Sequence, residues 1–390
     1  MSDAQNTDTP ATPAATPESG TSVMFAVGSR GLRLSIPAGV TLTQSGRAID
    51  EKPAATEAQQ RARVVDALTT STSGPALKQL AQGKRRVAIL VGDLSRPAPY
   101  EIALPAIVAA LTEVDIRPSR IAFLACPGGS GALLGRSAIH RYGEEICGDH
   151  EVNAWPVQGT PDALFDTADL RIAVAPRMEG AAFDAFLPAG VTVDCSLELT
   201  LGRSVQIEIE TARLFSGRTP PANAIAAHEP QQDADVLIVS GGGAPWEATL
   251  EEALLSLHAP RASAKTAVLV FGGDEGLGAS RFSRDVWTLI EQAEEVLAAG
   301  KSLGKPAPCS PSDAVSILAE CLKRYSHTVL FSAGFAEHSE GDDLIDRLAA
   351  APHVAKRLGV CANHAALWQL LELAHGEHYS VHAEPLGWRA

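Results

Sequence analysis

The chain has 390 residues, of which 45% are hydrophobic and 20% are charged, and its formal net charge is -14. At roughly 100 to 200 residues per domain, this length predicts two domains. The acidic balance argues against a nucleic-acid partner, because binding to a phosphate backbone needs clustered Lys and Arg. The longest basic run is only Lys84-Arg85-Arg86.

The sequence contains no membrane-span or export signal. No stretch reaches the roughly 18 to 20 uninterrupted apolar residues of a membrane span, and the N-terminus lacks a charged region followed by an apolar one. The six cysteines are far apart and form no C-x-x-C pair. We therefore expect a cytoplasmic protein with reduced thiols, no membrane partner and no metal site.

In chain order, the first segment is a leader. Residues 1–21 are rich in Thr, Pro, Ala and Ser and predict disorder, because they carry too little apolar surface to fold. Val23–Val27 and Leu32–Ile36 alternate as two strands around a tight turn, and we expect them to open the first domain. Helical spacing follows over Ala58–Leu68 and, after a Gly-Pro start, over Gly74–Leu80.

The next segments predict a parallel sheet. Arg86–Gly92 is a continuous aliphatic run, as in a strand covered on both faces. A helix over Pro97–Leu111 and a strand over Ile121–Cys126 complete a βαβ unit. Further strands are expected over Ile172–Ala175 and Val205–Glu210.

A second series of the same kind begins at Asp235–Ser240. It continues with a helix over Leu250–Leu257 and a strand over Ala267–Phe271. Val329–Ser332 and Tyr379–His382 are strands that either extend this second sheet or return to the first.

The segment Pro220–Gln232, rich in Pro, Ala and Gln, predicts the boundary between the domains. We place an N-terminal domain at residues 22–228 and a C-terminal domain at residues 229–390. The predicted fold is α/β, with two domains of mostly parallel sheets flanked by helices and a cleft between them.

The turn Asp93-Leu94-Ser95-Arg96-Pro97 is the leading candidate site. Ligands of parallel sheets lie beyond the carboxyl ends of strands, which is where Asp93 falls. Ser95 suits a helix N-cap, and Arg96 offers a guanidinium for a phosphate or carboxylate. The alternative is a capped helix start with an Asp-Arg pair on the surface.

Three glycine-rich loops also follow predicted strands: Gly128–Gly131, Gly241–Gly243 and Gly272–Gly278. The first and the third either wrap a ligand with their backbone N–H groups or are flexible turns. The acidic residues of the third loop would repel phosphate but suit a hydroxyl or a cation. The candidate ligand-binding residues are Asp93, Ser95, Arg96, Gly128, Gly129, Ser130, Gly242, Gly243, Glu275 and Gly276.

Seven histidines crowd the C-terminal end of the chain. His375-Gly-Glu-His378 resembles a metal-ligand spacing, but no helical His-x-x-x-His pair with a third ligand occurs. We expect Gly376 to end a helix that contains His364. These histidines are predicted to be structural or solvated.

Several motifs occur in the order in which a known family carries them. The motifs are Asp93–Pro97, Ile139–Glu145, Phe186–Val191, Ser240–Pro245 and Glu275–Gly278. Together they resemble the nickel-pincer lactate racemases over roughly residues 23 to 385.

The resemblance implies a racemase or epimerase of a small 2-hydroxy acid. Family members use a nickel-carrying pincer nucleotide that is tethered to a lysine, with one histidine on the metal and two histidines as acid and base. Such chemistry needs an amine, an imidazole ligand and imidazoles that titrate near neutrality.

This chain departs from that pattern. Asp184 stands at the position of the tethering lysine, and Gly129 or Ser130 stands at that of the first histidine. No lysine occurs between Lys84 and Lys265, and no histidine between His150 and His228. The sequence argues against a covalent nickel-pincer mechanism and leaves the cofactor unknown.

Three hypotheses follow. The first is a lactate racemase-like isomerase, or a divergent relative that binds a hydroxy acid or a nucleotide phosphate in the cleft. The second is a non-catalytic homologue that acts as a ligand sensor or partner subunit. The third is an enzyme with a freely bound cofactor, in which Arg177, Glu179 or Asp184 takes the place of the family's missing lysine and histidines. The sequence leaves open whether the chain forms a homo-oligomer.

Overall fold

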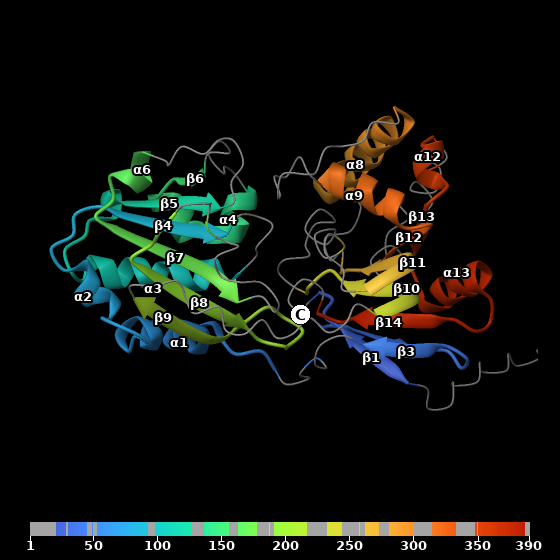
Figure 1. Ribbon diagram of the computed structural model, residues 1–390, viewed down its shortest axis with the longest axis horizontal. Coiled ribbons are helices and arrows are strands. Elements are labelled where there is room, and N and C mark those ends of the chain that lie inside the picture. The colour runs from blue at the N-terminus through green and yellow to red at the C-terminus, as the bar shows by residue number, and fades with distance from the viewer. Residues whose placement is uncertain are drawn as a thin grey trace, which may run out of the picture.

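The computed structural model describes the following residues: 21–28, 30–44, 49, 53–92, 98–126, 136–155, 163–177, 187, 191–216, 232–243, 257, 262–272, 281–299, 314–332, 348 and 350–386. They form two six-stranded sheets with helices packed on them (Figure 1). This confirms the predicted α/β class. Apart from its last residue, the expected leader at residues 1–21 lies outside the described part.

The first sheet has the strand order β6-β5-β4-β7-β8-β9. The strands are β4 (Val87–Gly92), β5 (Ile121–Cys126), β6 (Val152–Ala154), β7 (Leu170–Arg177), β8 (Cys195–Leu201) and β9 (Ile209–Ser216). All neighbours are parallel except β8 and β9, which are antiparallel. All six residues of β4 are buried, as expected for a central strand covered on both faces.

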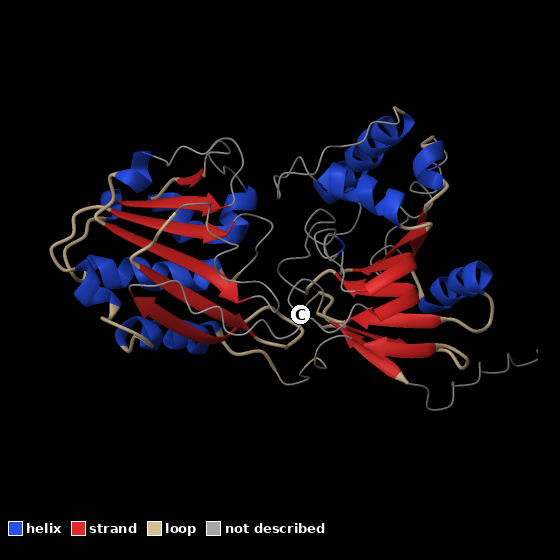
Figure 2. Cartoon of the chain, viewed as in Figure 1, coloured by secondary structure: helices blue, strands red, loops and turns tan. Residues whose placement is uncertain are grey.

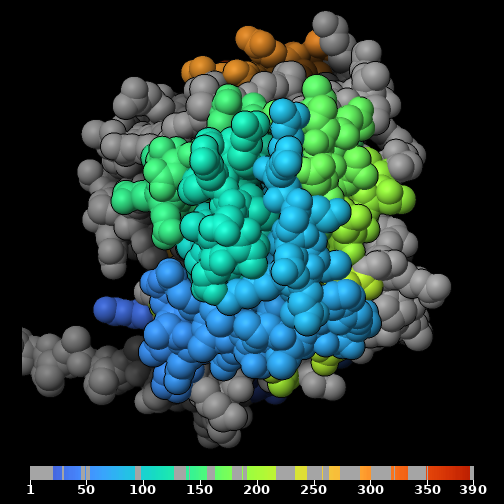
Figure 3. Space-filling view, turned by 90° about the vertical axis from the view of Figure 1, so that its left-hand side faces the viewer, coloured from blue at the N-terminus to red at the C-terminus, as the bar shows by residue number. Residues whose placement is uncertain are grey.

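Helices cover both faces of this sheet. The larger cluster of buried side chains lies under α1 (Glu57–Thr69), α2 (Leu77–Ala81), α3 (Tyr100–Thr112), α4 (Arg136–Tyr142) and α5 (Glu144–Asp149). The short α6 (Ala163–Asp166) lies on the other face, and a 3-10 turn, η1 (Pro118–Arg120), precedes β5. Figure 3 looks onto the amino-terminal end of this sheet, where segments between residues 50 and 200 pack together.

The second sheet has the order β13-β12-β11-β10-β14-β3, and its described pairings are all parallel. The strands are β3 (Thr41–Gln44), β10 (Gln232–Ser240), β11 (Ala262–Val270), β12 (His327–Phe331), β13 (Leu358–Cys361) and β14 (Ser380–Glu384). One face packs on α8 (Arg281–Ala298), α9 (Ala314–Arg324) and α12 (Pro352–Ala355). The other packs on α13 (His364–His375) and on the hairpin of β1 (Ser22–Phe25) and β2 (Leu32–Ser35).

The hairpin was correctly expected, but its place in the fold was not. β1 and β2 pack on the second sheet, and β3 pairs with β14 at Leu42 and Val381, so these strands do not open the first domain. A pairing between residues more than 300 positions apart leaves no local signal. The expected boundary falls almost entirely within residues 217–231, outside the described part, and the division at residue 228 stays a prediction.

Two local expectations were wrong. Residues 203–206 form bends and the strand starts only at Ile209, because Gly202 N–H donates to Glu208 O at 2.9 Å and closes the β8–β9 hairpin there. Helix α3 starts at Tyr100 with Pro99 as its N-cap residue, so Ser95 does not cap it. The expected helix at Leu250–Leu257 lies outside the described residues, apart from its last position.

The two sheets point toward each other. In Figure 2, the carboxyl ends of the parallel strands of both sheets are directed toward the middle of the molecule. The loops expected to bind ligand leave from these ends, although the cleft itself stays a prediction. Among the described helices, none is both long and apolar enough to cross a membrane.

Candidate functional site

The first sheet reverses its strand order next to β4. From β4 the chain continues to β5 and β6 on one side, and then returns to β7, β8 and β9 on the other. In open parallel sheets, ligands bind beyond the carboxyl ends of the two strands at such a switch point. The Asp93–Pro97 turn leaves from the end of β4, so the switch point between β4 and β7 is the candidate site.

Two buried tyrosines hold Gly92, the last residue of β4. Gly92 N–H donates to Tyr100 Oη at 2.7 Å, and Tyr142 Oη donates to Gly92 O at 3.0 Å. Both side chains have no exposed surface, and their rings lie 5.7 Å apart. The start of α3 and the end of α4 therefore fix the residue that precedes Asp93.

Tyr100 also bridges the switch point itself. Its hydroxyl donates to Val174 O on β7 at 3.3 Å while it accepts from Gly92 on β4. Direct pairing of the two strands ends one residue earlier, at Val91 and Val174. The Tyr100 hydroxyl thus replaces the next main-chain hydrogen bond between β4 and β7, immediately after the last residue pair of the two strands.

Two charged residues adjoin the tyrosines in the sequence, Glu101 next to Tyr100 and Arg141 next to Tyr142. Burial raises the pKa of Glu101 to about 7, although a backbone hydrogen bond and the nearby guanidinium of Arg141 act in the opposite direction. Arg141 is 1% exposed, and no partner contacts Glu101 Oε2 within the described residues. The helix ends that support the site therefore carry a carboxyl group that titrates near neutrality.

An arginine stands on the other side of the switch point. Arg177 is the last residue of β7, and its Nη1 lies 3.5 Å from Glu198 Oε1 on β8. The Arg177 side chain is 40% exposed, whereas that of Glu198 is 9% exposed. The site thus has a cation at the end of β7 that is anchored on a buried carboxylate.

Most of the predicted site residues lie outside the described part of the chain. This holds for Asp93, Ser95, Arg96, Gly128, Gly129, Ser130, Glu275 and Gly276. The strands that carry them are described, and Gly92 is level with Cys126 on the adjacent β5. The Asp93 turn and the Gly128 loop therefore leave from neighbouring strand ends, while their ligand-binding roles stay predictions.

Gly242 and Gly243 are described and follow β10 in the second sheet. Both are buried, with φ values of 109° and 83°, a region that disfavours any side chain. Gly242 N–H donates to Ser240 Oγ at 2.9 Å. That amide is therefore engaged within the protein and is not available to a phosphate in this conformation.

The second sheet also reverses its order, between β10 and β14, but main chain occupies that position. Ser240 Oγ donates to Ala26 O, and Ala26 N–H donates to Pro385 O at 2.8 Å. Ala26 is fully buried and packs in a small cluster with Ile49 and Leu386. The chain that follows β1 thus joins the two strand ends.

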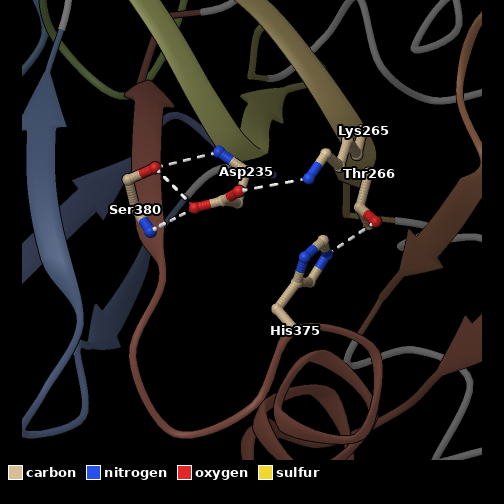
Figure 4. A network of polar contacts seen from close by, with 5 residues as sticks. All are labelled: Asp235, Lys265, Thr266, His375 and Ser380. Carbon is tan, nitrogen blue, oxygen red and sulfur yellow. Dashed lines mark hydrogen bonds and ion pairs between the residues drawn. The ribbon is translucent and has the colours of Figure 1, made fainter.

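The predicted structural role of the C-terminal histidines fits His375. Its Nε2 lies 2.9 Å from Thr266 Oγ1, beside a cluster in which Ser380 N–H and Oγ donate to Asp235 at 3.0 and 2.9 Å (Figure 4). Lys265 Nζ lies 3.9 Å from Asp235 Oδ1. The cluster joins the amino ends of three strands to the end of α13, and Gly376 ends that helix as expected.

No metal centre is present among the described residues. Within them, no group of three or more His, Cys, Asp or Glu side chains could hold a metal ion. Cys126, at the end of β5, is fully buried.

Sequence reasoning missed Tyr100, Tyr142 and Glu198 as parts of the site. A tyrosine inside an apolar helix and a glutamate inside a strand carry no motif. Only the adjacency of β4, β7 and β8 gives these side chains their positions.

Comparisons with known proteins agree with this geometry. Residues 28–158 match the family model of the lactate racemase N-terminal domain. No curated protein matches the sequence.

Among solved structures, the chain is similar to the lactate racemase apoprotein from Thermoanaerobacterium thermosaccharolyticum. The TM-score is 0.59 at 15% sequence identity, over 95% of this chain and 99% of that chain. At this identity the similarity shows the fold. The family model over residues 28–158 separately relates the first part of the chain to the lactate racemase N-terminal domain.

Proposed function

We propose that this protein binds a small 2-hydroxy acid, or the phosphate of a nucleotide, at the β4–β7 switch point and acts on the hydroxy acid as a racemase or epimerase. The observation that carries the proposal is the coincidence of the family match with this switch point. Residues 28–158 include β4, the Asp93–Pro97 turn and β5. The proposed partner is thus a small molecule, and Arg96 is proposed to bind its anionic group.

The residues present do not fit the family's covalent nickel-pincer group. No lysine occurs between Lys84 and Lys265, so β4, β5, β7, β8 and the loops at their carboxyl ends carry no amine. The end of β7 carries Arg177, and a guanidinium stays protonated and has no lone pair for a metal.

A non-catalytic ligand sensor or partner subunit is the second candidate. It is favoured by the absence of any histidine between His150 and His228, because the loops after β7 and β8 then lack a side chain that titrates near neutrality for proton transfer. An enzyme with a freely bound cofactor would need such a group from elsewhere.

One experiment addresses the cofactor. The protein is produced together with the enzymes that make the pincer nucleotide, weighed intact and assayed for nickel. We expect an unmodified mass and no stoichiometric nickel. A mass increase with one nickel per chain would contradict our conclusion on the tether.

A second experiment addresses the activity. Purified protein is incubated with D-lactate and with L-lactate, alone and with added pincer nucleotide, and the enantiomers are separated by chiral chromatography. Appearance of the opposite enantiomer supports the isomerase. Binding of lactate without conversion supports the sensor, and no binding of lactate or phosphate rejects both.

A further inference from the structure

The end of β7 extends beyond the end of β4. The two strands pair up to Val91 and Val174, and β7 then continues for three residues to Arg177. Along β7, Ala173 and Ala175 belong to the face of the sheet opposite the large helices. By alternation Arg177 lies on that same face, next to the point where the Asp93 turn leaves.

Glu198 holds this arginine from the neighbouring strand. It is level with Ala175 in the β7–β8 register, two pairs before Arg177 and Thr200. The carboxylate contacts only Nη1, at 3.5 Å. Within the described residues, the other N–H groups of the Arg177 guanidinium have no partner.

This arrangement differs from an ordinary surface ion pair, in which both side chains are exposed and the pair has little net effect. Here the Glu198 side chain is 9% exposed and the Arg177 side chain is 40% exposed. The buried partner restrains the arginine at one nitrogen, while the Arg177 side chain as a whole stays exposed to solvent. A guanidinium edge of this kind suits a carboxylate, which it binds through two parallel hydrogen bonds.

We infer that Arg177, restrained by Glu198, binds the carboxylate of the small 2-hydroxy acid at the β4–β7 switch point. This inference rests on the proposed function and adds a specificity residue to it. A substrate carboxylate at Arg177 would lie at the end of β7, beside the carboxyl end of β4. The requirement for a carboxylate would then be set by a strand residue, separately from any role of Arg96 in the turn.

The test compares binding of L-lactate, D-lactate and inorganic phosphate to the full chain by isothermal titration calorimetry. The variants are Arg177→Met, Arg177→Lys and the control Arg120→Gln. Arg120 is an exposed arginine in η1 at the amino end of the same sheet, so its replacement removes the same charge away from the site.

We expect the Kd of lactate to rise about 10- to 100-fold in Arg177→Met, because charge-assisted hydrogen bonds are lost. Arg177→Lys should retain part of the affinity, and Arg120→Gln should bind like the wild type. Lactate binding within twofold of wild type in Arg177→Met would overturn the inference. Equal losses in Arg177→Met and Arg120→Gln would also overturn it, because they would indicate a general field effect.

Other outcomes separate this inference from the proposed function. If Arg177→Met does not fold, Arg177→Lys decides, and unchanged lactate binding in it rejects the inference. Loss of lactate binding in the variants of a protein that never racemises lactate supports the role of Arg177 and rejects the isomerase. A wild-type protein that binds none of the probes rejects both.

Discussion

The two sheets reverse their strand order in the same way, but different parts of the chain lie at the two switch points. In the first sheet, Tyr100 Oη accepts from Gly92 N–H and donates to Val174 O. In the second sheet, Ser240 Oγ accepts from Gly242 N–H and donates to Ala26 O. One buried hydroxyl thus ties down the strand end in each half.

The two switch points differ in the residues that follow the strand ends. In the second half, the chain after β1 lies between the strand ends, and Ala26, Ile49 and Leu386 form an apolar cluster there. In the first half, the turn after β4 and the cation Arg177 follow. Strand order alone therefore does not make a binding site, because other parts of the chain can occupy the position.

The largest expected effect is at the first switch point. Tyr100→Phe leaves Gly92 N–H without its acceptor and Val174 O without its donor, and both are buried. We expect a loss of about 2 to 4 kcal/mol of unfolding free energy, measured by urea denaturation. The matched control is Tyr379→Phe in the second half, because the Tyr379 hydroxyl makes no hydrogen bond within the described residues. An equal loss there would show that the hydroxyl bridge of Tyr100 is not responsible.

The second switch point should be somewhat less sensitive. Ser240→Ala removes the hydroxyl that joins Gly242 N–H to Ala26 O. We expect a loss of about 1 to 3 kcal/mol, with any lactate binding unchanged because the proposed site lies in the other half. A variant of normal stability that no longer binds lactate would contradict the assignment of the site to the first sheet.

We expect Glu101 to make the free energy of unfolding depend on pH. Its pKa is raised to about 7 in the folded protein, so the native state binds the proton more tightly than the unfolded state. The stabilisation is therefore complete below the unfolded pKa and is lost as the pH rises through about 7. Glu101→Gln removes this titration and should lose less stability than the wild type between pH 5 and pH 8.

We expect that difference to reach about 1 to 2 kcal/mol, since water reaches part of the side chain and reduces the full linkage value. It is measured by chemical denaturation at several pH values. Parallel pH curves for the wild type and Glu101→Gln would show that Glu101 does not titrate in this range.

The smallest effect is expected at the opposite end of the second sheet. Ser380→Ala removes the hydroxyl that both accepts from Asp235 N–H and donates to the Asp235 carboxylate. We expect a loss of about 1 kcal/mol in thermal or urea unfolding, with no change in ligand binding. Reduced lactate binding would give this polar cluster a role that its position at the amino ends does not predict.

Much of the fold could be predicted from local patterns. The aliphatic run at β4 predicts a strand covered on both faces, and the alternation of strands with helices predicts parallel sheets. For the candidate site, the same patterns place the Asp93 turn and Gly242 after strand ends. The β8–β9 hairpin was missed because the alternation from Val205 continues across its connecting segment.

The sequence by itself thus determined the α/β class, the family motifs and the absence of the lysine and histidines needed for a tethered nickel group. Only the tertiary structure decided that β1 to β3 join the second sheet and that β7 lies beside β4. Strand neighbours are set by burial and hydrogen bonding between distant segments, which leave no trace in local spacing. For that reason the contacts of Tyr100 with Gly92, and of Arg177 with Glu198, emerge only from the folded chain.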